Sequence, residues 1–128
     1  MVTLIGMGSG SWEALSVQAQ DAVRRAGLVF GAKRLLAGLP PECTARQFAL
    51  YQPAEILETL AQAPGQDAAV LYSGDTGFYS GASGLLTPLR ALGIPARVYP
   101  GVSSIQLLAA ALGLSNMQGI IGLVRRIL

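Results

Sequence analysis

The chain has 128 residues, of which 52% are hydrophobic and only 12% are charged, and its formal net charge is +2. This length suits one domain that folds without support from disulfides or metal ions. So small a net charge gives no argument for nucleic-acid binding. The single cysteine, Cys43, excludes an internal disulfide and fits a reducing compartment, whereas the absence of histidine excludes a serine–histidine–carboxylate triad and argues against a zinc site.

Strands and helices are expected to alternate along the chain. Apolar runs of strand length predict strands at residues 2–5, 28–30, 44–50, 68–72 and 96–99. Helices are expected between and after them, at residues 13–26, 32–37, 53–61, 83–92 and 103–112. Ser9 or Ser11 is the expected cap of the first helix, and Pro88 is expected to limit the fourth to two short pieces. This order predicts an α/β fold, a three-layer domain with a parallel sheet of about five strands.

The apolar excess of the composition has two interpretations. It predicts several strands buried on both faces, or a large surface that meets a partner. It does not predict a membrane segment, because the uncharged stretch 98–124 has a purely apolar core only at residues 107–112, far short of the ~20 residues that a span needs. The apolar run 2–5 has no basic residues before it, unlike a signal peptide, so we expect a cytoplasmic protein.

Three loops rich in glycine or serine follow predicted strands, at residues 6–10, 73–81 and 99–104. Ligands of open parallel sheets bind at the carboxyl ends of the strands, and glycine lets a backbone approach a ligand closely. Each loop also has an ordinary structural interpretation: a tight turn, an Asx-type turn at Asp75, and an N-cap at Ser103. Because all three follow strands of one sheet, we expect them to share one edge and form a ligand site.

A nucleotide-binding Rossmann domain is a competing interpretation. Its fingerprint requires glycine or alanine where this chain has Ser11, and an acidic residue after the second strand, where this chain has Gly31. Trp12 and Tyr51 are interpreted as packing residues rather than substrate platforms, and Cys43 as an ordinary buried thiol.

Taken together, the three loops resemble those of the tetrapyrrole methylases. Residues 2–10 are similar to the family's opening glycine-x-glycine-proline-glycine, with Ser9 in place of the proline. Residues 73–81 resemble its glycine-aspartate-proline loop, with Thr76 in place of the proline, and residues 100–103 resemble its proline-glycine-valine-serine segment. Residues 31–36 and the second loop are similar to the precorrin-6Y methyltransferase branch, and the resemblance extends to about Ser115.

The resemblance implies an S-adenosylmethionine-dependent C-methyltransferase acting on a precorrin, precorrin-6Y in this branch, in cobalamin biosynthesis. Methylation at carbons 5 and 15 would accompany a decarboxylation catalysed by a partner domain or protein. The resemblance implies no catalytic side chain and places six residues at the cofactor: Gly74, Asp75 and Phe78 in contact, with Ser73, Ser103 and Ser104 beside them.

The substrate cleft is expected to involve Ser9, Lys33 and Arg34. The resemblance places Ser9 in the loop that faces the cleft, and the two cations are candidates for binding the carboxylates of the tetrapyrrole. Lys33 and Arg34 can equally be interpreted as a solvated helix start.

The family has two domains with the cofactor and tetrapyrrole between them. We expect residues 1–115 to form the N-terminal domain and residues 116–128 to be an atypical tail in place of the second. On this view the chain alone has little methyltransferase activity and self-associates as a homodimer. The sequence is also compatible with a methylase of a different tetrapyrrole, with a relative acting on protein or RNA, and with a non-catalytic truncated α/β domain.

Overall fold

The structure, a computed structural model, describes residues 1–8, 11–73 and 75–99, with the backbone alone for residues 75–81. Its elements follow in this order: β1 (Val2–Gly6), the 3-10 helix η1 (Trp12–Ala14), α1 (Val17–Arg25), β2 (Leu28–Phe30), α2 (Lys33–Ala37), β3 (Arg46–Phe48), α3 (Pro53–Ala61), β4 (Ala68–Tyr72), α4 (Asp75–Ala91) and β5 (Ala96–Tyr99). The five strands lie where the apolar runs predicted them.

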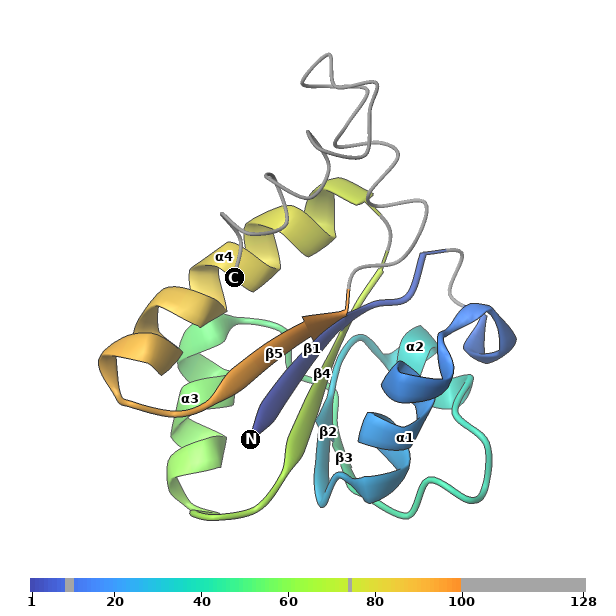
Figure 1. Ribbon diagram of the computed structural model, residues 1–128, viewed down its shortest axis with the longest axis horizontal. Coiled ribbons are helices and arrows are strands. Elements are labelled where there is room, and N and C mark those ends of the chain that lie inside the picture. Colours follow the sequence, from blue (N-terminus) through green and yellow to red (C-terminus); the bar gives the residue numbers. More distant parts are fainter. Residues whose placement is uncertain (9–10, 74, 100–128) are drawn as a thin grey trace.

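The strands form one sheet in the order β3-β2-β4-β1-β5, and every pairing is parallel. Helices α3 and α4 lie on one side of the sheet and α1 and α2 on the other (Figure 1). The predicted three-layer α/β domain is therefore confirmed. None of the helices in the described part of the chain has the length and apolar content that a membrane crossing requires.

The core consists of two apolar clusters, one on each face of the sheet. Strands β1 and β4 are buried along their whole length, and alternate residues of β1 point to opposite faces. Val2 and Leu4 pack with α3 and α4, whereas Ile5 packs with α1 and α2. Strands buried on both faces, one of the two interpretations of the apolar composition, are therefore present in this sheet.

The first helix begins later than predicted. Residues 12–14 form η1, and α1 starts after Ser16, whose hydroxyl accepts a hydrogen bond from the Ala19 amide at 3.2 Å. The backbone of Leu15 is extended (ψ 148°), which separates the two helices. Ser11 is not the cap of α1; its hydroxyl instead donates to the Glu13 carboxylate at 2.8 Å.

The fourth helix is longer than predicted, because α4 starts at Asp75 and continues past Pro88. Most of the expected second loop is thus the beginning of this helix. An interior proline costs about 3 kcal/mol. Leu85, Leu86 and Leu89 are buried against the sheet, and each contributes about 1.5–3 kcal/mol, so the apolar face outweighs the proline.

Candidate functional site

The strand order creates a crevice between β1 and β4. These strands are neighbours, but the chain leaves them in opposite directions: through α1 to β2 on one face, and through α4 to β5 on the other (Figure 1). Such a topological switch point, at the carboxyl ends of the strands, is where ligands bind in open α/β sheets.

The two strands part immediately after their last shared hydrogen bond. Gly6 pairs with Tyr72, and the Met7 amide donates to the Tyr72 carbonyl at 2.8 Å. Gly8 then turns the chain with a φ of 60°, a left-handed conformation that glycine adopts without strain. Half-buried Ser73 follows β4 at the same edge. The structure therefore brings the first loop and the start of the second together, as predicted.

The third loop follows β5, whose last residue, Tyr99, pairs with Ile5 of β1. Strand β5 thus ends at the same edge as β1 and β4. Among the predicted cofactor residues, Asp75 is the first residue of α4 and Phe78 follows within its beginning. The side chains of those two residues lie outside the described part, as do Ser9, Gly74, Ser103 and Ser104.

Lys33 and Arg34 are the first two residues of α2, and both are exposed. They follow β2, whose Phe30 pairs with Val70 of β4, so they leave the sheet at the edge that carries the crevice. Neither side chain forms an ion pair or hydrogen bond with any other described residue. Both cations are therefore available to an anionic ligand on the α1 and α2 side of the sheet.

Gly31 occupies the position where a dinucleotide-binding domain has its acidic ribose ligand. A Cβ atom here would lie 3.2 Å from Cβ of Leu71 and 3.3 Å from the Leu71 carbonyl oxygen, so the close approach of β4 favours glycine. The strand order also differs, because a dinucleotide fold has β1 beside β2, whereas here β4 separates them. Both observations argue against a Rossmann domain.

Three side chains near this edge bear on the other predictions. Trp12 is 8% exposed and packs in the core, as expected, but Tyr51 is 63% exposed, so its interpretation as a packing residue was wrong. Tyr72 was not among the predicted site residues; it ends β4 beside the crevice, and burial raises the pKa of its hydroxyl above its usual range. Its position as the last residue of a buried strand was the available signal.

An apolar hollow of about 330 Å³ opens at the opposite edge of the sheet. It is lined by the start of β1, the segment before β5 and the ends of α3 and α4, including Leu57, Leu60, Leu92 and Ile94. Because these segments precede the strands, the hollow lies at the end of the sheet away from the crevice.

The fold and the crevice define a class of protein: a parallel α/β domain with a glycine-lined crevice between β1 and β4. The sequence profile of the family described as Tetrapyrrole (Corrin/Porphyrin) Methylases matches residues 1–123. The chain belongs to this family.

Three relatives illustrate the match. The precorrin-4 C(11)-methyltransferase of Mycobacterium tuberculosis is 34% identical over 118 residues, which cover 87% of this chain and 47% of the relative. The uroporphyrin-III C-methyltransferase of Thermus thermophilus, solved in complex with S-adenyl homocysteine, is 28% identical with a TM-score of 0.59, covering 86% of this chain and 47% of that one. The precorrin-6Y methylase of Archaeoglobus fulgidus is 23% identical with a TM-score of 0.60, covering 90% and 59%.

These matches confirm the family but not the expected branch. The precorrin-6Y methylase shares the fold at 23% identity, whereas the 34% identity is to a precorrin-4 enzyme. The chain spans about half the length of the curated precorrin-4 methyltransferases it matches, 47% for the Mycobacterium tuberculosis enzyme.

Proposed function

We propose that this chain supplies the S-adenosylmethionine-binding part of a precorrin C-methyltransferase in cobalamin biosynthesis. The observation that carries the proposal is the crevice between β1 and β4, where Gly6, Gly8 and Ser73 meet at one edge of a tetrapyrrole-methylase domain. A related structure of this family contains S-adenyl homocysteine, the demethylated form of the proposed cofactor.

The described groups of the crevice suit such a cofactor. Backbone amides and carbonyls of the loops that follow β1 and β4 are proposed to bind the polar methionine and adenosine parts, since glycine lets a backbone approach a ligand closely. Gly74, Asp75 and Phe78 are proposed to contact the cofactor, and Ser73, Ser103 and Ser104 to lie beside it. Ser9 is proposed to face the tetrapyrrole, with Lys33 and Arg34 binding its carboxylates.

When bound, S-adenosylmethionine supplies a methyl group already activated by a sulfonium. The task of the protein is therefore to bind, to orient and to exclude water, and no side chain of this chain is proposed as a general base. Orientation alone can lower the barrier by up to about 7–11 kcal/mol in favourable cases. Hydrogen-bonded strand ends suit the task of orienting the ligand, as where the Met7 amide donates to the Tyr72 carbonyl.

Two precorrins are the candidate substrates. The motifs at residues 31–36 and 73–81 favour precorrin-6Y, whereas the 34% identity to a precorrin-4 enzyme favours precorrin-4. Transfer of a radioactive methyl group from S-adenosylmethionine to each precorrin, measured side by side in a version of the protein that carries the family's second domain, distinguishes them. Equal absence of transfer to both, in a protein that binds S-adenosylmethionine, would instead favour a different tetrapyrrole.

Cofactor binding is tested separately by calorimetry with S-adenosylmethionine, S-adenosylhomocysteine and NAD. We expect both methionine compounds to bind and NAD not to bind. Asp75→Ala should weaken binding while leaving the unfolding midpoint in urea unchanged. Binding of NAD without a response to either methionine compound would contradict the proposal, and an unfolded Asp75 variant would support the structural-turn interpretation.

We also propose a homodimer and, for a precorrin-6Y substrate, a decarboxylating partner. The high apolar content motivates the dimer, although the apolar residues expected to form its surface, within 107–123, lie outside the described residues. Sedimentation velocity at micromolar concentration tests this part. A monomer throughout the accessible concentration range would contradict it.

A further inference from the structure

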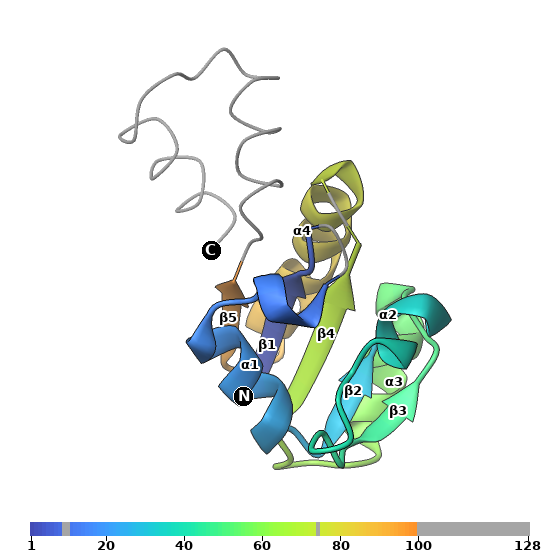
Figure 2. The ribbon, with the colours of Figure 1, turned by 90° about the vertical axis from the view of Figure 1, so that its right-hand side faces the viewer.

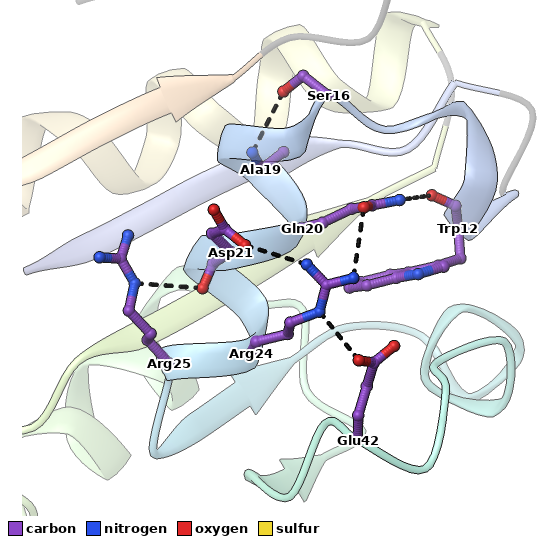
Figure 3. A network of polar contacts seen from close by, with 8 residues as sticks. All are labelled: Trp12, Ser16, Ala19, Gln20, Asp21, Arg24, Arg25 and Glu42. Carbon is purple, nitrogen blue, oxygen red and sulfur yellow. Dashed lines mark hydrogen bonds and ion pairs between the residues drawn. The ribbon is translucent and has the colours of Figure 1, made fainter.

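Arg24, in the last turn of α1, lies at the centre of a polar network (Figure 3). Its Nη1 atom is 3.0 Å from Oδ1 of Asp21, and its Nε atom is 3.2 Å from Oε2 of Glu42. Its guanidinium carbon lies 5.4 Å from the centre of a Trp12 ring, within the range of a cation–π contact. One side chain therefore contacts its own helix and two other segments, η1 and the connection between α2 and β3.

A second chain of contacts reinforces the first. The Nη2 atom of Arg24 donates to Oε1 of Gln20 at 3.5 Å, and Nε2 of Gln20 donates to the backbone carbonyl of Trp12 at 3.0 Å. The η1 segment is thus attached to α1 through both the ring and the backbone of Trp12.

Two segments outside α1 meet at Arg24, and one of them follows the first glycine loop at the crevice edge. Trp12 belongs to η1, in the connection that leaves β1 after the first glycine loop. Glu42 lies in the connection between α2 and β3, downstream of Lys33 and Arg34. Figure 2 shows η1, α1 and α2 together on this side of the sheet. Arg24 therefore links both connections to α1.

From this geometry we infer that Arg24 is a positioning residue for the cofactor site: it holds η1, the segment that follows the first glycine loop, against α1. The inference rests on the proposed function in naming S-adenosylhomocysteine as the probe. Arginine is required because a planar guanidinium can donate to Asp21, Glu42 and Gln20 while stacking on a ring. A lysine at this position would keep the positive charge but would lack the planar group with several N–H donors.

The network contributes little to overall stability. The side chains of Arg24, Asp21 and Glu42 are 34%, 50% and 54% exposed, and pairs this exposed contribute only about 0–1 kcal/mol each. Loss of Arg24 should therefore be visible mainly in the order of η1 and in ligand binding. Arg25 is a matched control, because it is the next residue of α1 and its one side-chain bond is to the Asp21 carbonyl, at 3.3 Å, among the described residues.

The test compares the purified protein with its Arg24→Gln, Arg24→Lys and Arg25→Gln variants. Trp12 is the only tryptophan of the chain, so its emission reports on η1 alone. We expect both Arg24 variants to show greater quenching of Trp12 by acrylamide, faster amide exchange at residues 12–15, and about three- to tenfold weaker binding of S-adenosylhomocysteine. The Arg25 variant should match the wild type, and all unfolding midpoints should stay similar.

The outcomes separate the two proposals. Wild-type affinity in Arg24→Gln, or unchanged exchange and quenching at η1, would overturn the positioning role. If the wild type binds no S-adenosylhomocysteine, the proposed function fails, while exchange and quenching at η1 still decide whether Arg24 positions this segment. Full rescue by Arg24→Lys would show that charge alone suffices and would also overturn the inference.

Discussion

Replacing Gly31 by alanine is expected to destabilise the protein and to disturb the candidate site. The added Cβ would lie 3.2 Å from Cβ of Leu71 and 3.3 Å from its carbonyl oxygen, and both belong to a strand buried along its whole length. Because β4 cannot easily move away, the added methyl group must displace Leu71, which directly precedes Tyr72 at the crevice.

The size of the effect follows from two opposing contributions. Overpacking a buried position costs about 1–3 kcal/mol, and replacing glycine in the unfolded chain returns about 0.4–1 kcal/mol of entropy. The free energy of unfolding should therefore fall by about 0.5–2 kcal/mol in Gly31→Ala. Gly84→Ala is the control: Gly84 is an exposed residue of α4, and its added Cβ would meet only Cγ of Pro53, at an ordinary 3.5 Å.

Urea denaturation measures both variants. Gly84→Ala should raise the free energy of unfolding by about 0.5–1 kcal/mol, because alanine favours a helix interior. With a slope of about 1–3 kcal/mol per molar urea, the two midpoints should move in opposite directions by several tenths molar. Binding of S-adenosylhomocysteine should weaken only in the Gly31 variant. An increase in stability on Gly31→Ala would refute the close approach of β2 and β4.

Other substitutions test the cap, the buried phenol and the free cations. Ser16→Ala removes the cap of α1 and should lower the free energy of unfolding by about 0.5–2 kcal/mol in urea. Because burial raises the pKa of Tyr72, the folded state keeps a proton that the unfolded chain loses near pH 10. Stability should therefore fall as the pH rises above about 10, and Tyr72→Phe should flatten that fall; an unchanged slope would contradict it. Lys33→Gln combined with Arg34→Gln should leave stability within about 0.5 kcal/mol and, in a version of the protein that carries the family's second domain, raise KM for the precorrin in methyl-transfer assays. An unchanged KM would support the other interpretation, in which Lys33 and Arg34 are solvated residues at the start of α2 and bind no ligand.

The strands and their parallel arrangement could be predicted because buried strands have a strong local pattern. Residues 68–72 form a continuous apolar run, and the structure places β4 there without a shift. The order of the strands could not be predicted, because the position of β4 between β2 and β1 depends on long-range packing. That order creates the switch point between β1 and β4. The sequence predicted that the ligand site lies at the carboxyl edge of the sheet, and the structure added which two strands flank the crevice.

Helix boundaries were harder to predict, because local preferences and tertiary packing compete there. Ser11 and Ser16 are both capable caps, and the extended backbone at Leu15 gives the role to Ser16. Glycines and Pro88 disfavour a helix locally, yet α4 forms because its leucines are buried on the sheet. The network at Arg24 joins residues 18 positions apart, and no local pattern in the sequence indicates such a contact.

Amide hydrogen exchange with and without S-adenosylhomocysteine tests most directly whether the crevice between β1 and β4 is the cofactor site. We predict that the ligand slows exchange at residues 6–11 and 73–78, and leaves residues 61–66 and 92–95, around the hollow at the opposite edge, unchanged. Slower exchange confined to residues 61–66 and 92–95, or no change anywhere at saturating ligand, would contradict the account.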